Sequence, residues 1–163
     1  MNKSNLIALA SALALASCGG GEAAGEAEAE ADRAAIMDFM DNTVQPTAEV
    51  YWGSAGWIVD EEGEHDLTPT TEEGWAATLK STQELQAQGE LLLTPLYAEG
   101  RGEDWTTFAQ AMIDVSKQAE QTAIDRDSDA IFETGGILYN VCRGCHTAYA
   151  PEEPPIDDPA AVE

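Results

Sequence analysis

The pattern that decides the fold is Cys142-Arg143-Gly144-Cys145-His146, followed by Thr147-Ala148-Tyr149. On a helix, Cys142 and Cys145 are separated by an i,i+3 step, and Cys142 and His146 by an i,i+4 step. Their three side chains therefore leave the same face. Apolar and small residues repeat on that face at helical spacing from Ile131 onward. The stretch thus predicts the last turns of an amphipathic helix.

Cys-x-x-Cys-His is typical of c-type haem attachment, in which two thiols bond the porphyrin vinyl groups and the adjacent imidazole ligates iron. We therefore expect one covalent haem c per chain, held by Cys142 and Cys145, with His146 as the proximal iron ligand. A structural zinc site needs four Cys or His ligands, yet the other histidine, His65, lies in an acidic segment. A thioredoxin-like pair would follow a strand, and a disulfide is the alternative in haem-free protein.

Four helical segments are predicted between residues 32 and 150. The first runs from about 32 to 56, and Pro46 should kink or break it because proline cannot donate a backbone hydrogen bond. The second begins at a capping box, Thr70-x-x-Glu73, and ends at Pro95. The others are expected to begin near residues 104 and 127 or 128.

The connections between these segments are predicted to be short and polar, and no strand pattern is present. Residues 60–66 contain five acids and predict an exposed loop. The segments predict an all-α fold, an antiparallel four-helix bundle with haem on its C-terminal helix. Core packing is expected for the four tryptophans, which are Trp52, Trp57, Trp75 and Trp105.

Residues 1–18 are similar to a bacterial lipoprotein signal peptide. Lys3 precedes an apolar stretch too short to span a bilayer, and Leu15-Ala16-Ser17-Cys18 resembles a lipobox. We expect Cys18 to be lipidated and to anchor an exported, periplasmic protein; an ordinary cleaved signal is the alternative. Gly19 replaces the aspartate that retains some lipoproteins in the inner membrane, which favours the outer membrane.

Two segments flank the predicted domain. Residues 19–31 contain four Gly and four Glu among alanines, which predicts a flexible acidic tether, with a frayed helix as the alternative. Residues 151–163 contain four Pro and five acids, which predicts a disordered tail.

The charge of the chain limits its partners. It has 31 acidic and 7 basic residues, a net charge of -24. Nucleic acid is excluded as a partner on electrostatic grounds, and membrane contact should depend on the lipid anchor alone. A redox partner should present a basic docking face. Basic side chains that could pair with the haem propionates are Arg33, Lys80, Arg101, Lys117, Arg126 and Arg143.

A helical bundle with Cys-x-x-Cys-His-x-x-Tyr on its last helix resembles the cytochrome c′ family, the class II c-type cytochromes, over residues 32–150. Further positions resemble a proteobacterial low-spin subgroup of that family: Met40, Pro46, Trp52, Trp105, Gly135 and Gly136. The resemblance implies thioether attachment at Cys142 and Cys145 and proximal ligation by His146. It also implies that two copies can form a homodimer.

In this family the distal side of the iron faces the first helix, where Met40 and Met37 lie one turn apart. We expect Met40 to be the distal ligand, with Met37 as the alternative; both could instead be core methionines. Met/His ligation favours an electron carrier with no enzymatic activity. A five-coordinate iron in an apolar pocket would instead bind nitric oxide or carbon monoxide. A peroxidase-like enzyme would need distal acid–base residues, and His65 is the only spare histidine.

Overall fold

The computed structural model describes residues 20–150. The signal peptide predicted at residues 1–18, including Cys18, and the tail predicted at residues 151–163 lie outside the described part. Two units are distinguished, Met1–Ala34 and Ala35–Glu163. The packing described below belongs to the second unit.

Helix is the dominant structure, so the predicted all-α class is confirmed for the described residues. The helices are α1 (Gly20–Phe39), α2 (Gln45–Trp52), α3 (Glu72–Leu92), α4 (Pro95–Ala98), α5 (Glu103–Asp125) and α6 (Ser128–Tyr149). A π-helical turn, η1 (Met40–Val44), joins α1 to α2, and a hairpin is formed by β1 (Trp57–Asp60) and β2 (Gly63–Asp66). No helix in the described part is both long and apolar enough to cross a membrane.

Helix α1 begins at Gly20, which differs from the flexible coil expected for residues 19–31 and agrees with the alternative of a helix. The physical reason is composition, because alanine has the highest helix propensity and glutamate is also a good helix former. Local propensity therefore outweighs the four glycines in this segment.

The kink or break expected at Pro46 does not appear as a break, because Val44 and Gln45 keep α-helical backbone angles and α1 continues through η1 into α2. Pro46 lies at the start of α2, directly after this π-helical turn. One residue earlier, the Gln45 N–H donates to the Met40 carbonyl, an i,i−5 bond that widens the turn. The extra residue in this turn changes the direction in which the side chains after Met40 point.

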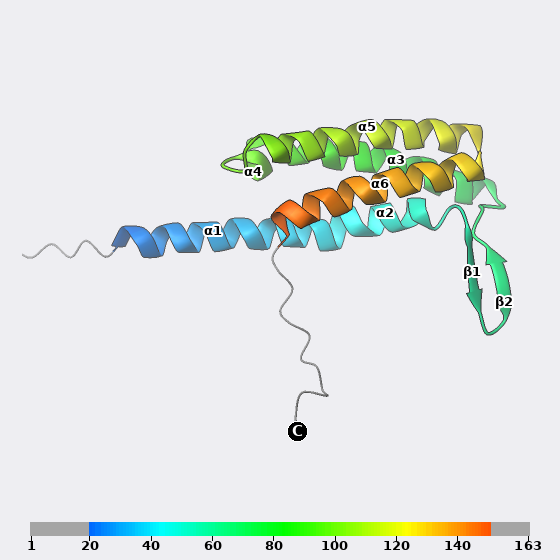
Figure 1. The fold of residues 1–163 in the computed structure, drawn as a ribbon, viewed down its shortest axis with the longest axis horizontal. Helices are drawn as coiled ribbons and strands as arrows, with labels where there is room; N and C mark the ends of the chain where they lie inside the picture. The colour runs from blue at the N-terminus through cyan, green and yellow to red at the C-terminus, as the bar shows by residue number, and fades with distance from the viewer. Residues whose placement is uncertain (1–19, 151–163) are drawn as a thin grey trace, which may run out of the picture. The chain divides into compact units, whose positions relative to one another are not determined.

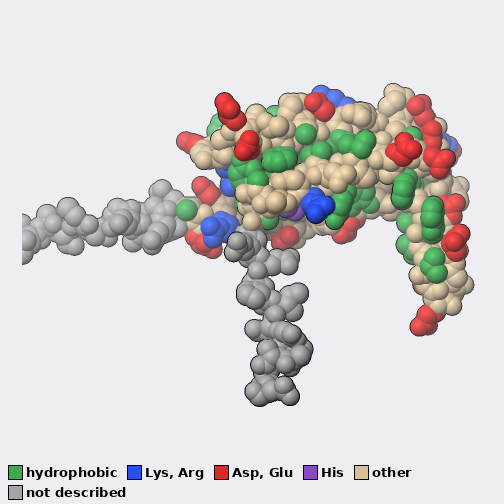
Figure 2. Space-filling model, in the orientation of Figure 1, with side chains coloured by type: hydrophobic (Ala, Val, Ile, Leu, Met, Phe, Trp, Pro, Cys, Tyr) green, Lys and Arg blue, Asp and Glu red, His purple; other side chains and the backbone are tan. Residues whose placement is uncertain are grey.

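The prediction of a strand-free loop at residues 60–66 was wrong. Strand β1 pairs antiparallel with β2, with Trp57 opposite Asp66, and the turn is closed by the Asp60 carboxylate, which accepts from the Glu62 and Gly63 N–H groups. The aromatic and β-branched run Trp57-Ile58-Val59 favours a strand. Trp57 is 66% exposed, so its expected role as a core anchor was also wrong. Figure 2 shows hydrophobic side chains on this hairpin flanked by acids.

The starts of α3 and α6 agree closely with the sequence, whereas α1 begins well before residue 32, the predicted start of the first segment. Thr71, one residue after the predicted Thr70, caps α3 by accepting from the Gly74 N–H. Asp127 caps α6 by accepting from the Ala130 N–H, as the alternatives of residues 127 and 128 predicted. Pro95, predicted to end the second segment, opens the short helix α4 instead, because proline is well suited to a first helical turn.

Helices α2, α3, α5 and α6 lie alongside one another (Figure 1), and contacts join α3 to α5, α5 to α6, and α2 to both α3 and α6. Buried hydrogen bonds connect the helices. The Tyr51 hydroxyl bonds to Thr122 at 2.9 Å, and the Trp105 indole donates to the Leu92 carbonyl at 2.7 Å. The hairpin lies at one end of this assembly and the Cys-x-x-Cys-His turns of α6 toward the other.

The tight packing of α3 against α5 at Gly89 leads to a stability prediction. A Cβ at Gly89 of α3 would lie 2.6 Å from Cγ1 of Ile113 on α5, so Gly89→Ala should destabilise the domain by about 1–3 kcal/mol through overpacking. A Cβ at Gly136 of α6 would meet nothing within 4 Å, so Gly136→Ala should stabilise by roughly 0.5–1 kcal/mol. Thermal unfolding of both variants provides the measurement. A stability gain in Gly89→Ala would contradict the α3–α5 packing.

Candidate functional site

Helix α6 places the motif at the boundary between core and solvent. Ile131 and Leu138 are fully buried and fix the rotation of the helix. Cys142 and Cys145 follow on the same face and are half-buried, while His146 is exposed. The sulfur atoms form no disulfide and remain free thiols. The two cysteines thus stand where the buried face of α6 opens into a cavity.

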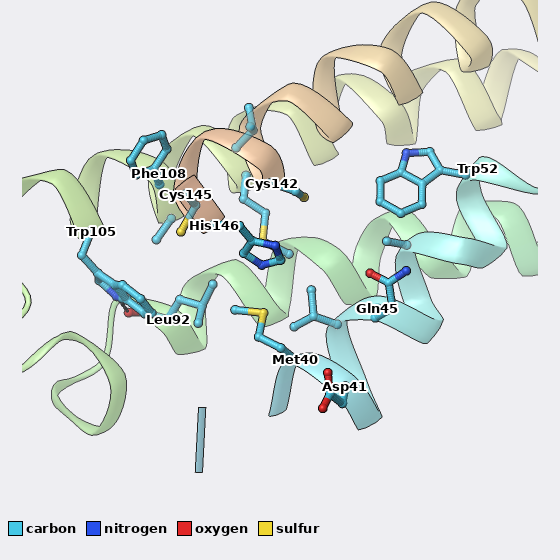
Figure 3. Close-up of a pocket in the computed structure, with 15 residues that line it drawn as sticks. Met40, Asp41, Gln45, Trp52, Leu92, Trp105, Phe108, Cys142, Cys145 and His146 are labelled. Carbon is cyan, nitrogen blue, oxygen red and sulfur yellow. Dashed lines mark hydrogen bonds between the residues drawn. The ribbon is translucent and has the colours of Figure 1, made fainter. Parts of the chain in front are cut away.

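This cavity has a volume of about 200 Å³ and is bounded by η1, α2, α3, α5 and α6. Cys142, Cys145 and His146 line it from one side, and Met40 lines it from the other. Figure 3 shows the Met40 thioether directed toward the His146 imidazole, with the two cysteine sulfurs above it. The remaining lining residues are mainly apolar and are Val44, Ala48, Trp52, Leu92, Trp105, Phe108, Ala109, Met112 and Val141, together with polar Asp41 and Gln45.

The structure separates the two candidate methionines. Met40 is half-buried against the core and lines the cavity beside both cysteines. Met37 is 44% exposed and does not line the main cavity, although it lines an adjoining pocket together with Met40, Cys145 and His146. Met112 on α5 also lines the main cavity, which the sequence pattern did not indicate because helical spacing places it on the core stripe. It is 5% exposed and belongs to the core cluster.

The glycines near the motif serve helix packing. A Cβ at Gly144 would lie 2.9 Å from the Phe108 ring of α5, and a Cβ at Gly135 would lie 3.2 Å from the Trp52 ring of α2. The Trp52 indole also donates to the Gly135 carbonyl at 3.0 Å. These contacts place both aromatic rings on cavity walls. Phe108 was not predicted as a site residue, because no local signal brings α5 against the motif.

The electrostatics of the two thiols differ from those of a redox-active pair. Burial, with a smaller effect of the neighbouring Cys145, raises the pKa of Cys142 to about 11. Burial also raises the pKa of Cys145, although the Arg101 charge acts in the opposite direction. Redox-active and metal-binding cysteines have lowered thiol pKa values. Burial therefore favours the protonated form of both thiols, in contrast to such cysteines.

Arg101 was one of six basic residues that the sequence offered as propionate partners, and the sequence alone did not favour it over the others. It lies between α4 and α5 and lines a pocket that also contains Met40, Cys145 and His146. Arg143 lines a more open pocket with Cys142 and His146. The basic side chains at the other four candidate positions pair with carboxylates within their own helix or, for Arg126, with Glu72 of α3.

The cavity brings together two thiols, an imidazole and a thioether, from Cys142, Cys145, His146 and Met40. Within the part of the chain that the structure describes, no three His, Cys, Asp or Glu side chains are clustered to hold a metal, whereas structural zinc sites need four such ligands. No protein-family model, curated protein or solved structure matches this chain. The residues and geometry of the cavity are therefore the basis for assigning a function.

Proposed function

We propose that this chain is a c-type cytochrome that carries one covalent haem and transfers electrons. The observation that supports the proposal is the convergence of four side chains on one apolar cavity, namely Cys142, Cys145, His146 and Met40. Two thiols, an imidazole and an opposing thioether are the groups needed to attach haem and to ligate its iron on both sides.

We propose that the helices form an antiparallel four-helix bundle, similar to that of the cytochrome c′ family. It is supported by the contacts of α2 with α3 and α6 and of α5 with α3 and α6. The connection from α5 to α6 is short, which favours antiparallel neighbours. The haem would be attached on the last helix of this bundle, between α6 and the η1–α2 segment.

Each residue has a separate role in this proposal. Cys142 and Cys145 would form thioethers, His146 would ligate the iron, and Met40 would occupy the opposite position. Trp52, Phe108 and Leu92 form apolar walls that would limit water access to the group. Bound haem would supply a one-electron couple, and Met/His ligation raises its reduction potential.

The setting of the protein is proposed from its sequence. Lipidation at Cys18 would anchor it to a bacterial membrane, with the outer membrane preferred and the cytochrome domain in the periplasm. Its partner would be a redox protein with a basic docking face, and their association should weaken as salt screens the charges. Two copies of the chain could form a homodimer. The proposed role is electron transfer without enzymatic activity.

An absorption spectrum of the haem-loaded protein tests this function. We expect a low-spin spectrum in both oxidation states, covalent haem after denaturation, and no change on adding carbon monoxide to the ferrous form. A high-spin ferrous protein that binds carbon monoxide would favour gas binding at a five-coordinate iron instead. Protein that never acquires covalent haem during expression with haem-attachment machinery would contradict both functions.

A further inference from the structure

Six basic residues are candidates for neutralising the haem propionates, and the described structure reduces them to two. Arg33, Lys80, Lys117 and Arg126 each form an ion pair with a carboxylate. Among the described residues, Arg101 and Arg143 form no such pair. They are also the candidates that line pockets shared with His146.

Arg101 is held in place by contacts of both its side chain and its backbone. Its Nε donates to the Tyr97 carbonyl at 2.6 Å, and its Cζ lies 4.6 Å from the centroid of the Trp105 ring. The Tyr149 hydroxyl, from α6, donates to the Arg101 carbonyl at 3.0 Å. Arginine stacks well on aromatic rings because its charge is planar and weakly hydrated. The side chain is therefore positioned before any group enters the pocket.

The backbone around Arg101 explains how a loop residue is held so firmly. Gly100 and Gly102 have φ angles of +76° and +84°, a region that other residues rarely adopt. The turn they form directs the chain from α4 into α5, whose first turn carries Trp105. Arg101 is half-buried as a result, whereas Arg143 is exposed on α6.

The contacts leave the terminal nitrogens of Arg101 available. Only Nε has a hydrogen-bond partner among the described residues. Asp41 lines the same pocket but forms no ion pair with Arg101. Two parallel N–H groups in a partly desolvated pocket match a carboxylate in bidentate geometry. Arg101 thus combines a fixed position, an unpaired charge and proximity to Cys145 and His146.

We infer that Arg101 binds a haem propionate and that its charge raises the reduction potential of the haem. This inference rests on the proposed function, since it needs haem attached at Cys142 and Cys145. The physical basis is that a nearby positive charge favours the ferrous form, which carries one positive charge fewer than the ferric form. Arg101 would act as a binding and tuning residue and would not ligate the iron.

The test compares the holoprotein with three variants that each remove one positive charge. In Arg101→Gln, the propionate bending band in the resonance Raman spectrum should shift to lower frequency and the midpoint potential should fall. In Arg143→Gln the band should stay in place and the potential should change less. Lys117→Gln, whose charge pairs with Asp114, should leave both unchanged. Arg101→Lys keeps the positive charge but loses the two parallel N–H groups of the guanidinium, so it should give an intermediate band shift.

The outcomes separate the two proposals. Covalent haem with an unchanged propionate band in Arg101→Gln would overturn the role of Arg101 and leave the cytochrome assignment intact. A band shift in Arg143→Gln alone would assign the propionate to the other arginine and also overturn the inference. Wild-type protein without covalent haem would overturn the proposed function itself. If Arg101→Gln does not fold, the propionate band in Arg101→Lys provides the test. A shifted band would support the role of Arg101, and an unchanged band would overturn it.

Discussion

Replacing Met40 with leucine should convert the haem from low-spin to high-spin and make the ferrous protein bind carbon monoxide. Leucine keeps the volume of the side chain, so the loss of stability should stay below about 1.5 kcal/mol, but it removes the sulfur that faces His146 across the cavity. The midpoint potential should fall by on the order of 0.1 V, because axial ligands set haem potentials over about 0.8 V. Absorption spectra and potentiometric titration provide the measurements.

The other methionines supply controls matched in chemistry. Met37→Leu changes a side chain that is 44% exposed and should leave the spectrum unchanged. Met112→Leu changes a methionine that lines the same cavity from the core side and should affect stability without changing the spin state. Loss of the low-spin spectrum in Met37→Leu, with Met40→Leu unaffected, would exchange the roles of the two residues.

Replacing His146 with alanine should remove the proximal ligand while leaving the haem covalently attached. In the proposed cytochrome the two thioethers would depend on Cys142 and Cys145, so haem staining should persist in a denaturing gel. The low-spin spectrum should be lost, and added imidazole should restore part of it, because His146 is exposed and its site is open to small molecules.

The other histidine is the control for this variant. His65 lies on β2 and hydrogen-bonds to Asp60 at 2.9 Å, at the opposite end of the helical assembly from the motif (Figure 1). His65→Ala should leave the haem spectrum unchanged. A normal low-spin spectrum in His146→Ala would rule out proximal ligation by this residue.

Local sequence patterns predicted most of the helical structure. The starts of α3, α5 and α6 depend on caps and on acidic residues within one turn of the helix end, and such signals involve neighbours in sequence. The face shared by Ile131, Leu138 and Cys142 likewise follows from helical spacing alone. The hairpin was missed because its acidic residues suggested solvent exposure, which a strand outside the core also allows.

The sequence favoured Met40 over Met37 as the distal ligand, and the tertiary structure shows which of them lines the main cavity. The two methionines lie one turn apart on the same predicted helix, and Met40 continues the apolar stripe to Val44. The π-helical turn at Met40–Val44 changes the path of the chain before Pro46, and packing against α3 and α6 leaves Met40 inside the cavity.

The sequence by itself determined the helical class and the two thiols and imidazole on one helix face, because those features depend on residues within four positions of one another. The Phe108 wall and the unpaired charge of Arg101 were decided only by the tertiary structure. Arg101 is 44 positions before Cys145 in the chain, and only the turn at Gly100 and Gly102 with the packing of Trp105 against Tyr149 brings them to the same pocket. Contacts over such separations depend on how helices pack, which no local pattern encodes.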